Sequence, residues 1–397
     1  MPKIGIREVD NTGTPSLGIT QNTVYIPGHA TEHVGPTLFA SASKFASAFG
    51  EDSSYIKDAS AHMAHHLLKM GMQVLYEGFV VEESSGTVSA PAIDWSALTD
   101  KALYDLRFLT TGAFFCPTAE MIACAAQRCD AVALIDSRET EPSLIRTEVE
   151  LLCKGAESIA VDSTADVTSF ATAFVPTITM IVNGLDGAVE MSVPASFGYL
   201  CAFAKSIQTN PMWYAVAGSF RGTIPGLVSV SRKYSNAECE MLQARAKDEE
   251  VVLDGAGDNV GIAINPIAEV RPFGPIIWGN RTARTNAMDN DSTGLLKATS
   301  FLNVRILSTE VAKTCYNAAR RYTFEQNNEI LWANFTSQII PLLDRMETGN
   351  GILDYKISRV ATNKKARLAA KITLIPIEAV EDFDITIELT DSISITE

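Results

Sequence analysis

Three of the five histidines lie close together, as His62, His65 and His66. In a helix, His62 and His66 would share one face, because residues four positions apart are neighbours there. Imidazoles in that arrangement could bind a metal ion, but no carboxylate or cysteine stands at a suitable spacing beside them. We therefore predict no metal site and leave the role of the three histidines open.

The segment DGAGDNVG, from Asp254 to Gly261, is rich in glycine. Its glycine spacing differs from the G-x-G-x-x-G that binds a dinucleotide pyrophosphate, and no clear strand precedes it. The acidic pairs at 82–83 and 249–250 lie in polar surroundings, which are more typical of a solvated surface than of acid–base catalysis. We interpret the glycine segment as a flexible turn and predict no catalytic residue and no cofactor.

The cysteines are odd in number and lie in apolar or helical stretches without a C-x-x-C pair. They are Cys116, Cys124, Cys129, Cys153, Cys201, Cys239 and Cys315. We expect reduced thiols that fill the core.

The chain has 397 residues, with 47 acidic and 32 basic side chains and a formal charge of −15. This charge opposes binding to nucleic-acid backbones and to anionic membranes. No apolar run has the roughly 18 residues that a membrane span needs. The start, MPKIGIREVDNTGTP, lacks the apolar core of a secretion signal. We expect a globular protein that assembles in the cytoplasm, without direct nucleic-acid binding or membrane insertion.

Before residue 300, helical and strand patterns alternate, which is typical of βαβ units. We expect strands at residues 22–28, 72–82, 107–112, 131–137 and 177–183, and helices at 37–50, 55–70, 97–106, 118–128, 141–154, 166–174 and 197–207. These elements predict an α/β layer that covers roughly residues 22–298.

Beyond residue 300 the pattern changes to two long helices, at 301–322 and 327–346, followed by strands at 368–376 and 383–390. Pro341 is expected to kink the second helix. The predicted fold is an α/β core domain at 23–298 and an α+β C-terminal assembly domain at 299–384. Extended arms are expected at 1–22, where the pattern is not periodic, and at 385–397.

Several stretches, in order, resemble the contractile tail sheath family of myoviruses, tailocins and related injection systems. They are VYIPGHATEHVGPTLFASASKFASAFGED (24–52), ALYDLRFLTTGAF (102–114), VPASFGYLCAFAKSIQTNPMWYAVAGSFRGTIPG (193–226), INPIAEVRPFGPIIWGNRTA (264–283) and the helical region 301–352. The fourth is the most specific, with an Asn-containing strand, a Gly-x-x-x-Trp-Gly strand and an Arg-Thr pair. Ala195 and the turn at 346–352 depart from the family pattern.

The resemblance implies a structural subunit rather than an enzyme. Such a subunit forms a homo-oligomer of hexameric rings, stacked in a helix around a tail tube protein. It contracts to drive the tube through the target envelope for genome ejection. The resemblance also implies contacts with baseplate and tail terminator proteins, a place in the virion tail, and no cofactor.

An exposed strand edge can be completed by an extended segment from another chain, and the resemblance implies that the arms do this between neighbouring subunits. The predicted arm residues are Lys3, Ile4, Ile6, Val9, Ile385, Ile387, Leu389, Ile393 and Ile395. The predicted arm-accepting residues are Lys364, Lys365, Arg367, Lys371, Ile372 and Leu374. The charged residues of 356–371 are all basic and those of 372–397 all acidic, which fits paired surfaces as well as a plain solvated edge.

Three basic residues of the helix at 301–322, Arg305, Lys313 and Arg320, fall near one side. We predict that they face an acidic tube surface, although an ordinary solvated face fits the same pattern.

Two other interpretations remain open. The alternating core is compatible with a nucleotide-dependent, doubly wound α/β enzyme. The chain could also be another self-assembling protein, such as a capsid or surface-layer subunit.

Overall fold

The computed structural model describes residues 22–50, 59–81, 83–84, 87–160, 166–243, 262–284, 298–361 and 366–379. Its main element is an eight-stranded sheet in the order β13-β12-β8-β7-β6-β1-β3-β2. The six inner strands are parallel, and β2 and β13 are antiparallel edge strands. The strands are β1 (Thr23–His29), β2 (Val34–Phe39), β3 (Gln73–Phe79), β6 (Phe108–Leu109), β7 (Val132–Asp136), β8 (Ala171–Val175), β12 (Ile264–Val270) and β13 (Gly274–Ile277).

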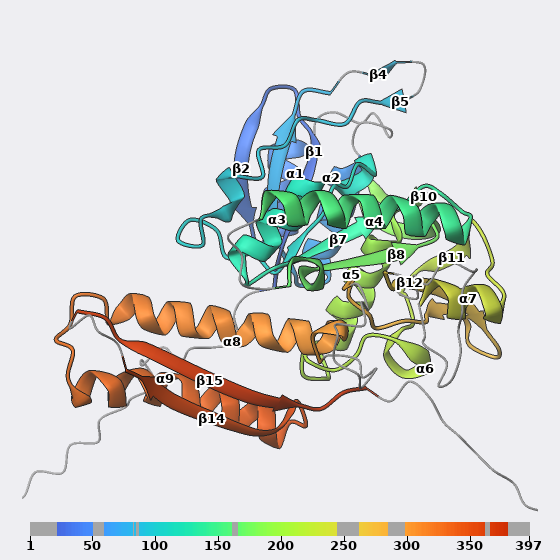
Figure 1. Cartoon of the computed structure of the whole chain (residues 1–397). Coiled ribbons are helices and arrows are strands. Elements are labelled where there is room, and N and C mark those ends of the chain that lie inside the picture. The colour runs from blue at the N-terminus through green and yellow to red at the C-terminus, as the bar shows by residue number, and fades with distance from the viewer. Residues whose placement is uncertain are drawn as a thin grey trace, which may run out of the picture.

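Both faces of this sheet are covered, as expected for a mainly parallel sheet (Figure 1). Successive residues of β1 point to opposite faces: Val24 and Ile26 belong to one apolar cluster, and Tyr25 belongs to the other. The first face is covered by α2 (Ala59–Lys69), α5 (Ala195–Ser206) and a small antiparallel sheet of β10 (Gly187–Val193), β9 (Ile178–Gly184) and β11 (Leu227–Val230). The second face is covered by α3 (Ala119–Arg128), α4 (Pro142–Ile159) and α7 (Asn236–Leu242).

The remaining elements of the core are short. They are α1 (Ala42–Phe49), α6 (Gly218–Arg221) and the two-residue strands β4 (Glu83–Ser84) and β5 (Thr87–Val88). The seven cysteines have free thiols, and four of them are buried as predicted, whereas Cys116, Cys129 and Cys315 are only partly buried. Burial raises the pKa of Cys124 and of Cys153 to about 12. Within the described ranges, no helix has the length and apolar character needed to cross a membrane.

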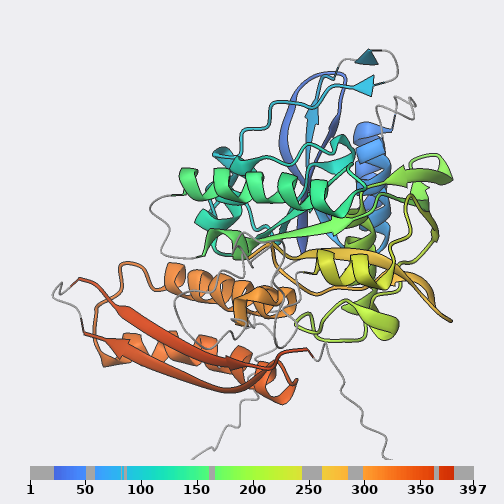
Figure 2. The same cartoon turned by 45° about the vertical axis from the view of Figure 1, so that its right-hand side comes forward.

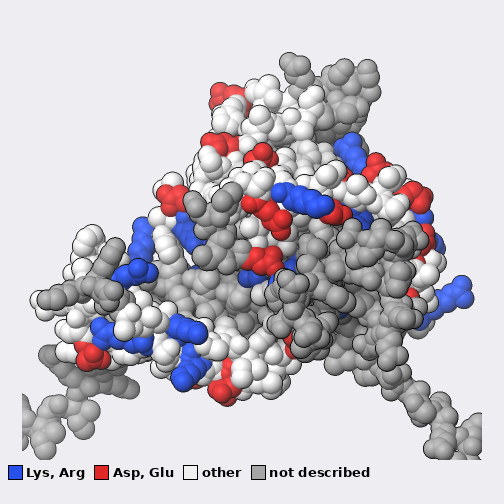
Figure 3. All heavy atoms as spheres, in the orientation of Figure 1, with Lys and Arg blue, Asp and Glu red and all other residues white. Residues whose placement is uncertain are grey.

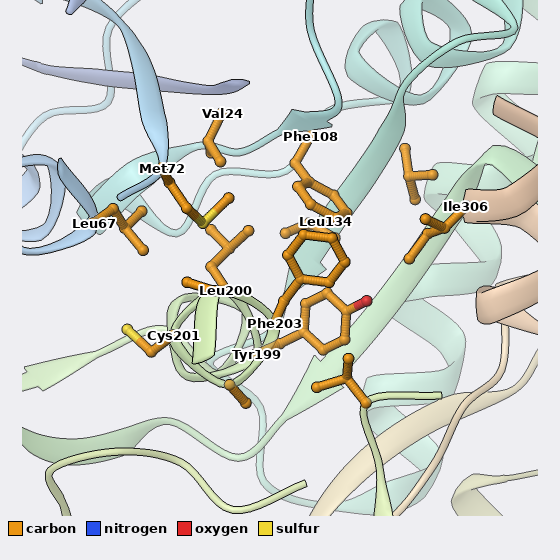
Figure 4. Packing of buried hydrophobic residues seen from close by; sticks show 14 of the residues in the cluster. Val24, Leu67, Met72, Phe108, Leu134, Tyr199, Leu200, Cys201, Phe203 and Ile306 are labelled. Carbon is orange, nitrogen blue, oxygen red and sulfur yellow. The ribbon is translucent and has the colours of Figure 1, made fainter. Parts of the chain in front are cut away.

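The C-terminal unit lies along one side of the core (Figures 1 and 2). It consists of α8 (Leu302–Arg321), α9 (Glu329–Thr348), β14 (Ile352–Val360) and β15 (Ala369–Pro376). Ile306 of α8 belongs to the same apolar cluster as Phe108 of β6 and Phe203 of α5 (Figure 4). The unit therefore shares a hydrophobic core with the parallel sheet.

Most of the predicted elements are confirmed, including α3, α4, α5, α8, α9 and β15. The helix predicted at 97–106 is wrong: residues 97–99 form a single 3-10 turn, and the chain beyond it is irregular. The helix predicted at 166–174 is also wrong, because a 3-10 turn at 167–170 leads into β8. The helix predicted at 37–50 begins only at Ala42, since residues 34–39 form the edge strand β2.

The three clustered histidines of α2 hold the turn between β9 and β10. Backbone N–H groups of Asn183 and Leu185 donate to Nδ1 of His66 (2.8 Å) and of His62 (3.0 Å). Nδ1 of His65 lies 2.9 Å from the Asn183 carbonyl, to which it can donate in one tautomer. No group of three or more His, Cys, Asp or Glu side chains in the described chain is placed to hold a metal ion. The histidines therefore join α2 to the small sheet.

This arrangement predicts that acid weakens the β9–β10 turn. Burial lowers the pKa of His62 and, with help from His65 and Lys69, lowers the pKa of His66 to about 4. A folded-state pKa below the unfolded value of about 6.5 adds stability above pH 6.5, and that stability is lost as the pH falls through about 4. The protection factors of the backbone amides of residues 183–185, which correct exchange rates for their intrinsic pH dependence, should fall over this range.

The double variant His62→Gln/His66→Gln should remove this pH dependence, because glutamine accepts hydrogen bonds without titrating. The exposed His33 serves as the matched control, and His33→Gln should keep the wild-type profile. A double variant with the wild-type acid response would contradict the role of the two imidazoles.

Candidate assembly surface

Strands β14 and β15 form a two-stranded antiparallel sheet at the edge of the C-terminal unit (Figure 1). The pairs Tyr355–Leu374 and Ile357–Ile372 are partly buried and pack against the apolar cluster that contains α8 and α9. The pairs that alternate with them, Lys356–Thr373 and Ser358–Lys371, lie on the opposite face, where both lysines are exposed. One face of the sheet is therefore apolar and covered by the chain itself, and the other is basic and exposed.

Both outer edges of this sheet lack a strand partner within the described residues, since its order is simply β14-β15. A two-stranded sheet is marginally stable in water, so packing against helices must support this one. Its exposed side also carries large apolar residues: Leu353 is 64% exposed and Ile375 is 50% exposed. Open edges beside exposed apolar side chains are features of a sheet that accepts further strands.

Helix α8 is fixed to the core by buried charges. Glu310 of α8 forms an ion pair with Arg107, the residue before β6, and the two side chains are 1% and 0% exposed. Lys313, three residues after Glu310 on α8, forms an ion pair with Asp105 at the same edge of the core. Two ion pairs on one face of the helix therefore fix which turn of α8 meets the sheet.

Arg305, five residues before Glu310 on α8, adds a third polar contact. Its guanidinium donates to the backbone carbonyl and to the side chain of Ser169, and it lies 4.0 Å from the centre of the Phe170 ring. Burial lowers the pKa of Arg305 to about 10. Burial, reinforced by Arg107, lowers the pKa of Lys313 to about 8. These shifts reflect the transfer of the charges out of water.

The segment 264–283, which carried the most specific sequence resemblance, connects the core to the start of α8. Asn265 is fully buried in β12, and its amide donates to Thr172 Oγ1 (2.9 Å) and to the Arg281 carbonyl (2.8 Å). Its Oδ1 accepts the Arg281 backbone N–H at 2.8 Å. A side chain at Gly279 would collide with that oxygen, which explains the need for glycine there.

After the residues held by Asn265, the chain makes direct contacts with the start of α8. Asn280 Nδ2 donates to Asn303 Oδ1 at 2.7 Å, and the Asn280 carbonyl accepts the Leu302 N–H at 2.9 Å. The Arg281 guanidinium lies over the Phe301 ring, 4.8 Å from its centre.

The end of α9 is held by a tryptophan from the core. Trp213 Nε1 donates to the Gly349 carbonyl at 3.0 Å. A Cβ atom at Gly349 or Gly351 would come within 2.8 Å of the indole. The two glycines therefore permit close approach of the ring, and the helix pair is anchored to the core at both ends.

Comparison with solved structures places this arrangement in a known fold. The sheath complex of an extracellular contractile injection system (PVC) in the contracted state matches with a TM-score of 0.62 and 16% identity, over 99% of this chain and 98% of that one. The chain has the fold of a contractile-sheath subunit. A chain from the contracted baseplate structure of the anti-feeding prophage matches with a TM-score of 0.62 and 14% identity, over 98% and 99% of the two chains.

The sheath resemblance seen in the sequence is confirmed by a second comparison. The tail sheath protein of Vibrio phage KVP40 is 26% identical over 164 residues, which are 41% of this chain. The match spans a fifth of that relative's length. No protein-family model matches the chain. The names of these relatives denote structural parts of contractile particles, in agreement with the predicted non-enzymatic role.

The predicted arm residues all lie outside the described residues of this sheath-like chain, as do Lys364, Lys365 and the segment DGAGDNVG. Of the predicted arm-accepting residues, Lys371 and Arg367 are exposed. Ile372 and Leu374 point to the covered face of the β14–β15 sheet. An added strand would therefore meet the backbone edge and the lysine face, while the two apolar side chains serve the chain's own core.

The predicted tube-facing row on α8 is wrong for two of its three residues. Arg305 is 8% exposed and Lys313 is 3% exposed, because both pack against the core as described above. Arg320 is exposed, and its Nη1 lies 3.5 Å from the Ala102 carbonyl. The sequence patterns did not indicate the roles of Arg107 and Glu310. The regular spacing of charged residues within an otherwise amphipathic α8 was the available signal.

The buried pair predicts a large cost for removing one partner. Glu310→Gln should lower the free energy of unfolding by about 3–5 kcal/mol, because the buried Arg107 then loses the carboxylate with which it pairs. The double variant Arg107→Met/Glu310→Leu should lose less than Glu310→Gln alone. Denaturant unfolding of the wild type and the variants measures both effects.

The exposed pair Glu150–Lys154 on α4 provides the matched control. Glu150→Gln should change stability by less than about 1 kcal/mol, as is usual for surface ion pairs. Equal effects at Glu310 and Glu150 would show that the α8 joint contributes no more than a surface contact.

Proposed function

We propose that this chain is the subunit of a contractile tail sheath. It polymerises as hexameric rings stacked in a helix around a tail tube and contracts to drive the tube through the target envelope for genome ejection. The observation that carries the proposal is the agreement in fold with a contractile sheath complex over 99% of the chain. In this proposal the tube, baseplate and tail terminator proteins are its partners, and the virion tail is its location.

In this proposal, residues 23–298 form the core domain and residues 299–384 form the assembly domain. Residues 1–22 and 385–397 are arms that add strands to the β14–β15 sheets of neighbouring subunits. The open edges of that sheet and the lysines of its exposed face support this assignment. The three acidic residues of the 385–397 arm, Glu388, Asp391 and Glu397, would meet this basic face.

Contacts between non-identical patches generate helices that need not close, and a polymer of this kind can adopt two packings. Contraction would move each subunit as a body while the arms bend. Small and polar residues within the arms suit such a hinge; they are Asn11, Gly13, Ser392 and Ser394. The joint between α8 and the core supports rigid movement, because bending there would separate buried charges.

Deleting residues 1–11 and 391–397 should leave a folded monomer that does not polymerise. Because the proposed arms act between subunits, thermal unfolding of the truncated monomer should match that of the full chain. Sedimentation and negative-stain imaging report assembly, which for a sheath means hollow striated cylinders. Unimpaired cylinders from the doubly truncated chain would refute the arm model.

A charge reversal tests the accepting surface separately. Lys371→Glu should weaken polymerisation of the full-length chain, because the acidic arm then meets a like charge. Lys154→Glu on α4 is the matched control and should polymerise normally. If the two variants behave alike, the lysine face of β15 has no part in arm binding.

A further inference from the structure

The turn between α8 and α9 presents a phenylalanine to solvent. Phe324 is 103% exposed, and its backbone φ is +75°. A bulky residue in this left-handed region is a rare and strained choice. Backbone strain of this kind persists where the surrounding structure imposes it, and it concentrates at functional positions. A fully exposed ring contributes little to the stability of its own chain. A contact with another molecule would explain why a phenylalanine occupies this position.

The turn that carries Phe324 is braced by polar contacts. Arg359, near the end of β14, bonds to Glu329 at 2.6 Å and to Asn327 at 2.9 Å. Asn327 also donates to the Arg367 carbonyl at 3.3 Å. The end of the helix pair and the end of the β14–β15 sheet are thereby tied together, so the ring is presented from a fixed support.

Further apolar and basic residues lie at this end of the unit. Ile330 is 70% exposed and Val360 is 42% exposed. Arg320 and Arg321, which precede the turn, are both exposed. We call the turn 322–328, with Ile330 and Val360, the tip. An aromatic anchor with neighbouring arginines is the composition of an interaction hot spot.

The charge of the chain is divided between its two units. Residues 299–379 carry eleven basic and seven acidic side chains, whereas residues 1–298 carry twenty-one basic and thirty-four acidic ones. Figure 3 shows Lys and Arg gathered on the lower-left part of the molecule, where Figure 1 places the C-terminal unit. The α/β core of another copy is therefore opposite in net charge to the C-terminal unit that bears the tip.

We propose that the tip docks on the acidic α/β core of a second copy of this chain, with Phe324 as its anchor. The contact is heterologous, since the tip and the core are different surfaces, and it therefore propagates along a polymer. The inference rests on the proposed sheath function, but it uses no arm residue and forms a separate interface.

Phe324→Gly and Phe324→Asn test the anchor without endangering the fold. Both residues tolerate a positive φ, and the ring removed is fully exposed, so thermal unfolding should stay at the wild-type temperature. Polymerisation should need about tenfold more protein, as is typical when a buried aromatic hot spot is lost. Added salt should weaken polymerisation of the wild type, because the C-terminal unit and the core carry opposite net charges.

Ile340 on α9 is 37% exposed and lies outside both the tip and the core, so Ile340→Ala provides the control and should polymerise like the wild type. A photo-crosslinking analogue at position 324 should capture residues 22–284 of another copy. Capture of residues 380–397 or of a tube protein, or capture of nothing, would overturn the inference. Normal polymerisation of Phe324→Gly would also overturn the inference about the tip, but it would leave the sheath proposal intact. A wild-type chain that forms no cylinders would contradict the sheath proposal itself.

Discussion

The position of the C-terminal unit depends on the charges that α8 buries against the core. A buried ion pair gains little net stability over apolar packing, but an unpaired buried charge is expensive. If α8 slipped by one turn, Glu310 would lose Arg107 and Lys313 would lose Asp105. The apolar contacts of Ile306 and Leu307 would tolerate such a slip far better, since they are not directional. The charges thus select one register, while the apolar cluster supplies most of the attraction.

Two further anchors secure the ends of the same helix pair. Asn265 locks the strand that leads toward α8, and Trp213 holds the carbonyl that ends α9. Each anchor satisfies buried polar groups that would otherwise be costly, so none can open without a penalty. The β14–β15 sheet packs on α9 and is therefore connected to the parallel sheet through both helices. A load on its open edges would pass to the core through this path.

The sequence predicted those parts of the fold in which a local pattern decides the structure. Periodic apolar residues defined α8 and α9, and the alternation of helices and strands defined the core. The pattern failed at 166–174, because a short apolar run fits either a helix or a buried strand. Pairing with the neighbouring strands of the sheet makes residues 171–174 a strand. The pattern failed also for Arg305 and Lys313, because helical spacing shows which residues share a face but not what covers that face. Asn265 and Trp213 act over separations of up to 136 residues, which no local window detects.

The basic face of the β14–β15 sheet has two physical consequences. Exposed sheet edges pair with unrelated strands unless something discourages it, and lysine on an edge strand is a common protection. Lys356 and Lys371 provide this protection, since a neutral or basic strand gains little from lying beside them. An acidic strand, however, would gain charge pairing in addition to backbone hydrogen bonds. In the proposed assembly, the same lysines would discourage indiscriminate pairing and favour an acidic partner such as the proposed C-terminal arm. Selective pairing of this kind lets a sheet remain open in the monomer and closed in a polymer.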